Sequence, residues 1–154
     1  MEIKGAIFDL DGTLLDSMWV WNQVDIDFLG KRGFDVPPDY PKAIAAMGFH
    51  ETAEYTIKRF DLKEKVKDVI AEWDRMAAQM YHERVQIKPY VREVLEWMKQ
   101  QGIHLGVATA SYRTLFEPCL RRNGVFEYFE AVTETSEVER GKGFPDIYIK
   151  AAEK

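Results

Sequence analysis

The stretch that decides the fold is Ala6-Ile7-Phe8-Asp9-Leu10-Asp11-Gly12-Thr13-Leu14. Residues 6–8 form a short apolar run, which is typical of a strand buried on both faces. Asp9 follows at the carboxyl end of that strand, where open α/β sheets place their ligands. Gly12 allows the chain to turn sharply after Asp11, because glycine has no Cβ to clash. The stretch therefore predicts a strand that ends in two neighbouring carboxylates.

Two carboxylates this close repel each other unless a positive charge lies between them. Mg²⁺ prefers clustered oxygen ligands and suits phosphate chemistry, so we expect Asp9 and Asp11 to hold this metal. One carboxylate would act as a nucleophile and the other as a proton donor. The alternative is an ordinary turn that carries two solvated acids. The apolar strand before the pair and the Gly-Thr-Leu after it favour the catalytic interpretation.

The composition is that of an ordinary soluble protein. Of the 154 residues, 46% are hydrophobic and 31% are charged, which is enough for one domain or two small ones. The net charge of −5 does not indicate the positively charged surface that nucleic-acid-binding proteins carry. No apolar run approaches the length of a membrane span, and no secretory leader precedes the first strand. With Cys119 as the single cysteine, we expect a cytoplasmic protein without disulfides.

Residues 17–86 show helical periodicity and no convincing strand. Asp16 and Ser17 predict a helix N-cap, and Gly33 predicts the end of that helix. Pro41 opens a short helix, residues 49–50 are expected to form a turn, and another helix should run to about residue 60. The longest helix is predicted from an apolar stripe with steps of three and four. The stripe comprises Val66, Val69, Ile70, Trp73, Met76, Ala77, Met80 and Tyr81.

The remaining chain alternates between helices and strands. Strands are expected at 103–108 and 129–133, and helices at about 91–101, 115–123 and from Pro145 onward, with Pro118 kinking the second helix. This alternation is the βαβ pattern of a parallel sheet. We therefore expect an α/β fold with a Rossmann-like parallel-sheet core, formed by residues 1–16 and 87–154. Residues 17–86 would be an inserted α-helical cap, joined through a hinge at 86–89.

Three polar positions should converge on one edge of this sheet. Thr109 ends its strand as Asp9 does, and its hydroxyl, with the backbone amides of Ala110 and Ser111, could donate to phosphate oxygens. Lys142 lies in the loop before the last helix and could supply a positive charge to a phosphate dianion. Each of these residues alone is a weak signal, but their order behind the acidic pair predicts a phosphate site.

These motifs resemble the haloacid dehalogenase superfamily, whose members are mostly Mg²⁺-dependent phosphatases and phosphomutases. Residues 6–14 resemble its first signature, residues 107–111 its second, and Gly141-Lys142 with residues 145–148 its third. The resemblance implies that Asp9 becomes an aspartyl-phosphate while Asp11 first protonates the leaving alcohol and then activates water. It also implies that Thr109, Ala110 and Lys142 hold the phosphoryl group. Mg²⁺ would bind the Asp9 carboxylate and the Asp11 backbone carbonyl, and the helical insertion would be the family's mobile cap.

The second acid favours phosphate ester hydrolysis over dehalogenation, because a departing alkoxide needs a proton and a halide does not. A sugar phosphomutase resembling β-phosphoglucomutase remains an alternative. It is less favoured because residues 47–51 lack an arginine for a second phosphate and include Glu51. A signalling receiver domain also uses aspartate, threonine, lysine and Mg²⁺, but it has no room for the insertion between Asp9 and Thr109. A non-catalytic remnant is disfavoured as well, because two unneeded acids at the end of a strand would only lower the stability of the fold.

The resemblance also indicates what is missing. The family continues with a further strand that carries an acidic pair for Mg²⁺, whereas this sequence ends at Lys154. We therefore expect a truncated chain that alone is weakly active or inactive. A further C-terminal segment, or self-association, would cover the exposed sheet edge. Residues 143–144 depart from the proline-containing stretch usual after the lysine, which weakens the assignment of Lys142.

The substrate is expected to be a small phosphorylated metabolite, with no nucleic acid or membrane as partner. Trp21, Phe49 and His50 are candidates to line the underside of the cap and select the substrate, although ordinary cap packing is the favoured interpretation of these residues. Phosphosugars, phosphoglycolate and nucleotides all stay open as substrates at this stage.

Overall fold

The computed structural model describes residues 3–154, and the chain divides into two compact units. The core unit comprises Met1–Met18 and Met80–Lys154, and the helical unit comprises Trp19–Gln79. The helical unit is thus an insertion early in the chain. The predicted cap, residues 17–86, overlaps it, and its role as a mobile cap stays a prediction.

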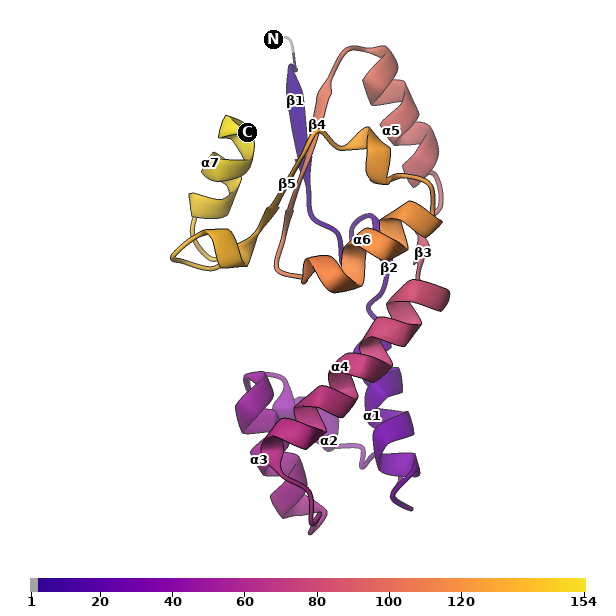
Figure 1. The fold of residues 1–154 in the computed structure, drawn as a ribbon, viewed down its shortest axis with the longest axis vertical. Helices are drawn as coiled ribbons and strands as arrows, with labels where there is room; N and C mark the ends of the chain where they lie inside the picture. The colour runs from indigo at the N-terminus through magenta and orange to yellow at the C-terminus, as the bar shows by residue number, and fades with distance from the viewer. Residues whose placement is uncertain (1–2) are drawn as a thin grey trace. The chain divides into compact units, whose positions relative to one another are not determined.

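The core unit contains a three-stranded parallel sheet in the order β1-β4-β5 (Figure 1). Its strands are β1 (Gly5–Phe8), β4 (His104–Thr109) and β5 (Ala131–Glu134). The register pairs Phe8 with Val107 and Thr109 with Glu134. The carboxyl ends of all three strands therefore lie at the same end of the sheet, which is where parallel α/β sheets place their binding and catalytic sites. The parallel α/β core expected from the sequence is confirmed.

The prediction that the first strand is buried on both faces is wrong. Residues 5–8 are alternately exposed and partly buried, and the side chain of Ile7 is 38% exposed. The reason is position, because among residues 3–154 β1 pairs only with β4 and is the edge strand of the sheet. An apolar edge strand of this kind is a template for pairing with another chain.

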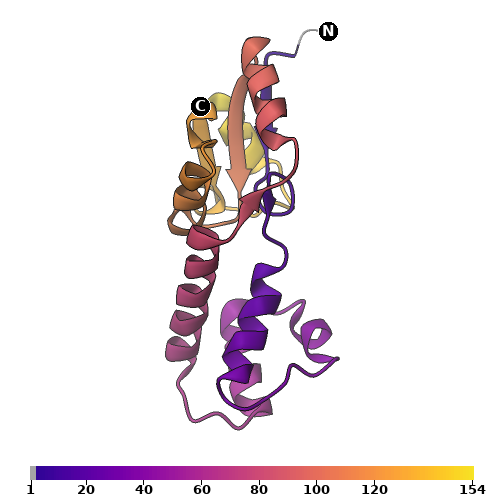
Figure 2. The same ribbon diagram turned by 90° about the vertical axis from the view of Figure 1, so that its right-hand side faces the viewer.

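Helices cover both faces of the central strand (Figures 1 and 2). Helix α5 (Val91–Gln100) contacts β4, and α7 (Asp146–Glu153) contacts all three strands from the opposite side. As a result, residues 105–109 of β4 are fully buried. Ala108 packs with Ile147 and Ala151 of α7. Tyr148 of the same helix is 42% exposed.

Helix α6 (Arg113–Arg122) runs through Pro118, where a shortened or kinked helix was expected. Proline lacks the N–H that would bond the carbonyl four residues earlier, so the carbonyl of Thr114 needs another donor. His82 Nε2 lies 2.8 Å from that oxygen and donates a hydrogen bond to it.

On the buried side of the helix, Cys119 is inaccessible, and burial raises the pKa of its thiol to about 11. A short 3₁₀ helix, η1 (Phe126–Tyr128), follows α6, and η2 (Thr135–Glu137) follows β5.

A second, two-stranded antiparallel sheet joins β2 (Leu15–Asp16) to β3 (Gln86–Ile87). Its existence corrects two expectations. Asp16 lies in β2 and is not a helix N-cap, and residues 86–87 form a paired strand where only a linker was predicted. The chain segments that enter and leave the insertion are therefore joined by backbone hydrogen bonds, and Lys88 N also donates to Leu14 O at 2.8 Å.

The helical unit comprises α1 (Val20–Gly30), α2 (Tyr40–Ile44), α3 (Phe49–Arg59) and most of α4 (Val66–Glu83). The stripe predicted for the longest helix packs inward at Val69, Trp73 and Ala77. The turn expected at residues 49–50 is wrong, because these residues form the first turn of α3 behind an extended Gly48. Among residues 3–154, no helix combines the length and apolar character that a membrane span requires.

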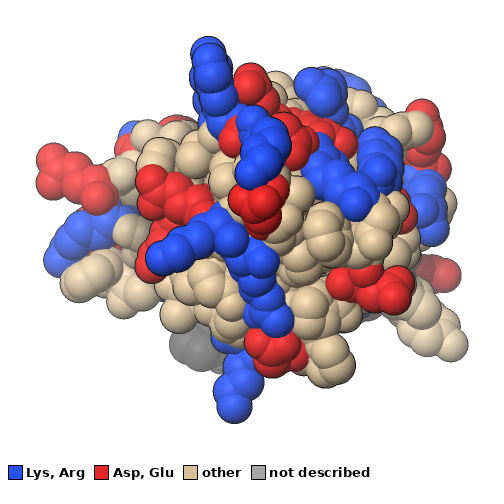
Figure 3. All heavy atoms as spheres, turned by 90° about the horizontal axis from the view of Figure 1, so that it is seen from below, with Lys and Arg blue, Asp and Glu red and all other residues tan. Residues whose placement is uncertain are grey.

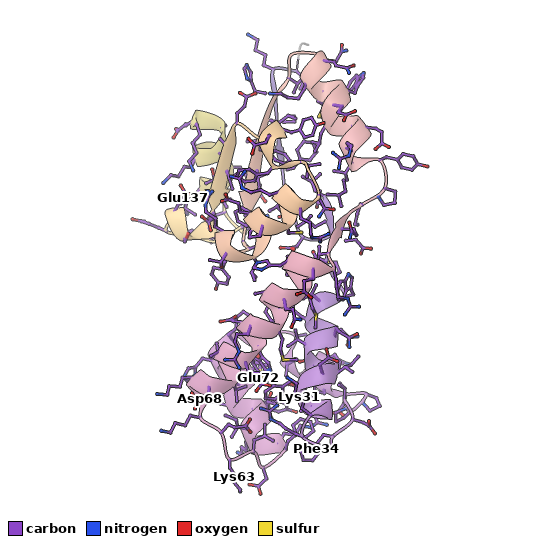
Figure 4. The ribbon with its side chains drawn as sticks, turned by 45° about the vertical axis from the view of Figure 1, so that its right-hand side comes forward. Lys31, Phe34, Lys63, Asp68, Glu72 and Glu137 are labelled. Atoms are coloured by element: carbon purple, nitrogen blue, oxygen red, sulfur yellow. The ribbon has the colours of Figure 1, made fainter. Side chains whose placement is uncertain are left out.

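Aromatic and ionic contacts tie α1 to α4. Phe28 and Trp73 meet edge to face with ring centroids 5.5 Å apart. Arg32 stacks over the Phe28 ring and pairs with Glu64 and Glu72. Lys31, the residue after α1, and Glu72 of α4 lie near each other (Figure 4), with Nζ and Oε1 3.5 Å apart. On the face shown in Figure 3, cationic and acidic side chains are interspersed, with no broad patch of one sign.

Asp25 of α1 gives the helical unit a testable pH dependence. Burial raises the pKa of its carboxyl from 3.8 to about 6. Because the folded state holds the proton more tightly, stability contributed by the neutral form is complete below about pH 4 and is lost as the pH rises to about 6.

Asp25→Asn is therefore expected to raise the melting temperature at pH 8 by about 2–6 °C, after allowance for partial exposure, and to have little effect near pH 4. Thermal melts at both pH values check this, with Asp27→Asn as the matched control on the same helix. An equal gain at both pH values would contradict the explanation.

Candidate active site

Asp9 lies directly after β1, and its carboxylate binds two donors. The backbone N–H of Leu10 donates to Oδ1 at 2.8 Å, and Lys142 Nζ lies 2.5 Å from the same oxygen. The two side chains are partly accessible, 43% exposed for Asp9 and 23% for Lys142. The loop before α7 therefore brings a cation onto the carboxylate at the end of β1. An ammonium group here also offsets the repulsion between Asp9 and Asp11.

The turn after Asp9 is fixed by backbone hydrogen bonds that converge on one carbonyl. Leu10 is fully buried, and its oxygen accepts from the amides of residues 13–15 at 2.9–3.0 Å. Gly12 has a φ of +77°, and a Cβ at this position would lie 2.9 Å from Met18 Sδ. Lys88 Nζ donates to the Gly12 carbonyl at 2.7 Å. The positive φ therefore favours glycine here, whereas the exposed Met18 side chain can move to make room for a Cβ.

Asp11 is held by two hydroxyl groups. Ser17 Oγ donates to Asp11 Oδ1 at 2.7 Å, and the Tyr81 hydroxyl donates to the same oxygen at 2.5 Å. Tyr81 is 3% exposed, and burial, followed by the hydrogen bond to Asp11, raises the pKa of its phenol. The phenol therefore stays protonated and can donate to Asp11. Two fixed donors restrict the rotamers of Asp11, which suits a group that must present a proton in one direction.

Thr109 ends β4 with its side chain fully buried. Its Oγ1 accepts a hydrogen bond from the Ser111 amide at 3.0 Å, so that amide already has a partner, contrary to its expected use as a phosphate donor. The parallel register places Asp9, the residue after β1, and Thr109, the last residue of β4, at the same end of two neighbouring strands. Ala110 follows Thr109 directly. The order of the strands thus brings Thr109 and Ala110, the predicted phosphate-binding residues, to the end of the sheet where Asp9 lies.

Ser17, Tyr81 and Lys88 are site residues that the sequence analysis missed. Ser17 fits the pattern of an N-cap, and Tyr81 completes an apolar helical stripe, so local rules assign both to structure. Their contacts with the acidic turn join residues 6, 70 and 76 positions apart, respectively. The one available signal was the position of Tyr81 at the last inward step of the stripe, beside the predicted hinge.

The donor set of the site fits a hard cation that keeps most of its own water. It offers the Asp9 carboxylate and the Asp11 backbone carbonyl, both oxygen ligands. Within residues 3–154 there is no cluster of three or more His, Cys, Asp or Glu side chains that could hold a metal ion. Mg²⁺ commonly binds through one or two carboxylates, with water and substrate phosphate completing its coordination. The Asp9 carboxylate and the Asp11 carbonyl are therefore oxygen donors of the kind that Mg²⁺ takes.

The candidate substrate residues lie in the helical unit. Trp21 and Phe49 line a cavity within that unit, and their rings meet edge to face with centroids 5.1 Å apart. His50 does not line this cavity. Its side chain is 74% exposed, with Nδ1 3.7 Å from Glu54 Oε1. A direct contact between these residues and substrate stays a prediction.

The family model of the haloacid dehalogenase-like hydrolases matches residues 6–154. The chain belongs to this family. The match includes the acidic turn, the end of β4 and the lysine loop, so the resemblance inferred from three short motifs is confirmed, together with the expectation of a hydrolase.

The curated proteins that this chain resembles include phosphatases. Hexitol phosphatase B of Escherichia coli strain K12 is 28% identical over 159 residues, which cover 99% of this chain and 70% of the relative. The phosphorylated carbohydrates phosphatase of Thermotoga maritima is 24% identical over 152 residues, covering 99% and 70%. Pyrophosphatase PpaX of Bacillus cereus strain Q1 is 27% identical over 152 residues, covering 98% and 68%.

Solved structures share the fold of this family member. A Thermotoga maritima protein solved as a candidate β-phosphoglucomutase superposes with a TM-score of 0.88 at 24% identity, covering 98% of this chain and 70% of that one. The structure of CbbY from Rhodobacter sphaeroides in complex with phosphate superposes with a TM-score of 0.71 at 22% identity, covering 99% and 72%. These likenesses confirm the Rossmann-like core with a helical insertion.

Proposed function

We propose that this protein is a phosphatase that hydrolyses a small phosphate monoester through an aspartyl-phosphate on Asp9, with Mg²⁺ as cofactor. The observation that carries the proposal is the arrangement at the end of β1. There the Asp9 carboxylate contacts the Lys142 ammonium, while the neighbouring Asp11 is oriented by Ser17 and Tyr81. The phosphatase names of the curated relatives support this choice of reaction.

The residues divide the reaction into two steps. An Asp9 carboxylate oxygen forms a bond to phosphorus while the bond from phosphorus to the ester oxygen breaks, and Asp11 gives its proton to the departing alkoxide. Asp11, now ionised, takes a proton from water, whose oxygen attacks the phosphorus of the aspartyl-phosphate. Phosphate leaves, the Asp9 carboxylate is restored, and Asp11 is protonated again. The chain thus ends the cycle as it began.

Lys142 stabilises the charge on the phosphoryl oxygens during both steps. When bound, Mg²⁺ would supply further electrostatic stabilisation of the phosphoryl group from the side of Asp9 and the Asp11 carbonyl. The Thr109 hydroxyl and the Ala110 amide would hold the phosphoryl group at the end of β4. Fixed donors around a transferring phosphoryl group are the main contribution that a protein makes to this chemistry.

The substrate class is proposed as phosphorylated small metabolites, in line with relatives named for hexitol and phosphorylated carbohydrate substrates. A phosphomutase is the second candidate, because structural neighbours include β-phosphoglucomutases. Glu51, in the first turn of α3, disfavours a second phosphate bound there.

The experiment that tests the function supplies the protein and Mg²⁺ with a panel of phosphorylated sugars and sugar alcohols. A phosphatase releases inorganic phosphate, and a mutase converts a hexose 1-phosphate to the 6-phosphate without release. Phosphate release that requires Mg²⁺ and is lost on chelation with EDTA is the expected result. Conversion without release would replace the proposal with the mutase. Neither activity on any substrate, for this chain and for the chain extended to the length of its relatives, would contradict both.

Tyr81→Phe is expected to lower kcat about 10-fold with little change in KM. The substitution removes one of two donors to Asp11, and a hydrogen bond to a charged group is worth about 1.5–3 kcal/mol. Steady-state kinetics check the prediction. Tyr128→Phe is the matched control, because it removes a phenol that donates to the exposed Glu96 in the same unit. Equal kcat values for the two variants would show that Tyr81 does not position Asp11.

A further inference from the structure

Asn123, the residue that follows α6, is buried against the segment that joins α4 to β3. It is 8% exposed, and both ends of its side-chain amide are hydrogen-bonded. Oδ1 accepts from the backbone N–H of Ile87 at 3.2 Å, and Nδ2 donates to the carbonyl oxygens of Val85 at 3.1 Å and Cys119 at 2.8 Å. Because a buried amide needs partners for its donors and its acceptor, this set fixes the side chain in one orientation.

The contacts of Asn123 reach further than those of an ordinary helix cap. Asparagine is common where helices end, and its bond to the Cys119 carbonyl belongs to that role. The bonds to Val85 and Ile87 instead join residues 38 and 36 positions apart. The Arg122 guanidinium donates to the same Val85 carbonyl. Two neighbouring side chains from the end of α6 therefore anchor the residue at which the chain leaves α4.

The anchored carbonyl lies close along the chain to a donor of the active site. Val85 is fully buried, and its backbone N–H donates to the Met80 carbonyl at 3.0 Å, which ties it to the last turn of α4. Tyr81 belongs to that turn, and its hydroxyl donates to Asp11 Oδ1 at 2.5 Å. Hydrogen bonds weaken steeply when distance or angle departs from the optimum. A small shift of the end of α4 would therefore cost Asp11 one of its two donors.

We propose that Asn123 is a positioning residue for Asp11, because it holds the end of α4 where the Tyr81 hydroxyl meets the Asp11 carboxylate. Asn123 acts through Tyr81 and touches no reacting atom. The proposal rests on the proposed function, in which Asp11 moves the proton. Active-site groups need a supporting shell that fixes their rotamers, and a buried amide that both donates and accepts supplies such support from α6.

The kinetic test compares Asn123→Leu with the wild type on the best substrate of the panel. Leucine has a similar volume but neither donor nor acceptor, so kcat should fall about fivefold while KM changes by less than about twofold. In the Tyr81→Phe background, the same substitution should lower kcat by less than about twofold, because the hydroxyl that Asn123 places is already absent. Equal losses in the two backgrounds would overturn the proposal.

Leu95→Ala is the matched control for a general loss of stability. It removes a fully buried side chain from α5, the helix that packs on β4, and should lower the melting temperature. Measured well below that temperature, its kcat should lie within about twofold of the value for its parent in both backgrounds. A loss as large as that of Asn123→Leu would show that a loosened core, and not the amide bridge, lowers kcat, and would also overturn the proposal.

A readout that needs no activity is the ¹³Cζ resonance of Tyr81 in protein labelled at this carbon of tyrosine. Tyr81→Phe identifies the signal by removing it, and Asp11→Asn shows where it lies once the carboxylate acceptor is lost. In Asn123→Leu, the signal should move towards its position in Asp11→Asn. In Leu95→Ala, it should stay at the wild-type position. An unchanged signal in Asn123→Leu would overturn the proposal whatever the kinetics.

These measurements separate the positioning role from the reaction itself. If the wild type releases no phosphate from any substrate, the phosphatase proposal fails, and the Tyr81 signal alone decides whether Asn123 places the hydroxyl on Asp11. If Asn123→Leu does not fold, Asn123→Asp replaces it, since aspartate keeps the acceptor for Ile87 and loses the amide donor. The same shift of the Tyr81 signal is expected in Asn123→Asp, and an unchanged signal in this folded variant would refute the role of Asn123.

Discussion

Asp9→Asn is expected to reduce phosphate release by about 10⁴-fold or more, the scale of loss seen when the nucleophile of a covalent mechanism is removed. Asparagine is close to aspartate in shape, so the turn that follows β1 should persist. Its neutral amide cannot attack phosphorus effectively and no longer pairs with the Lys142 ammonium. Phosphate release from the best substrate of the panel, measured against the wild type in Mg²⁺, checks the prediction.

The control for this variant is Asp35→Asn, an exposed acid in the helical unit that has no place in the proposed chemistry. Its activity should equal that of the wild type. Thermal melts and circular dichroism establish that Asp9→Asn is folded, since a collapsed site would also lose activity. If folded Asp9→Asn kept more than a tenth of the wild-type rate, another residue would have to be the nucleophile.

Asp11→Asn is expected to reduce turnover by about 10²–10⁴-fold, the usual contribution of general acid–base catalysis. The loss should differ between substrates. Esters of aliphatic alcohols need a proton on the leaving oxygen and should show the full loss in the first step. p-Nitrophenolate is a stable anion, so its departure should be far less affected.

The second step depends on Asp11 for every substrate, because the same aspartyl-phosphate must be hydrolysed. With p-nitrophenyl phosphate, Asp11→Asn should therefore release about one equivalent of p-nitrophenol rapidly and then turn over slowly. A stopped-flow record of p-nitrophenol checks this. Equal losses for aliphatic and nitrophenyl esters, without a burst, would show that Asp11 is not the proton donor.

The parts of this site that could be predicted from the sequence are those set by local pattern. Asp9 follows an apolar run and precedes a glycine that the turn favours, so strand end, turn and acidic pair are all encoded within nine residues. The alternation of strands and helices likewise places Thr109 at the end of a parallel strand. Lys142 was placed by its order in the chain and by resemblance.

The parts that could not be predicted depend on contacts between distant segments. Ser17 has the local signature of an N-cap, yet its hydroxyl donates to Asp11 and α1 begins only at Val20. Phe49 follows a glycine that suggests a break, yet Gly48 is the extended residue from which α3 starts. Pro118 is tolerated because His82, from a different helix, satisfies the carbonyl that proline leaves unbonded. Tertiary partners outweigh local preference in each case.

The edge position of β1 is the feature of the core with the clearest physical consequence. Residues 5–8 are partly exposed because only one neighbouring strand pairs with them. The chain spans about 70% of the length of the curated relatives it matches. Pairing of a further segment or a second copy along this edge stays a prediction, and light scattering of the 154-residue protein at increasing concentration measures the second possibility.

The central claim is that Asp9 carries the phosphoryl group during turnover. The most direct measurement mixes Asp11→Asn with p-nitrophenyl phosphate and Mg²⁺, stops the reaction in acid, and locates the phosphoryl group by mass spectrometry. We predict one phosphoryl group per chain, on the peptide that contains Asp9, removed by hydroxylamine as expected for an acyl phosphate. Continued release of p-nitrophenol with no phosphoryl group on Asp9, or with the group on another residue, would contradict the account.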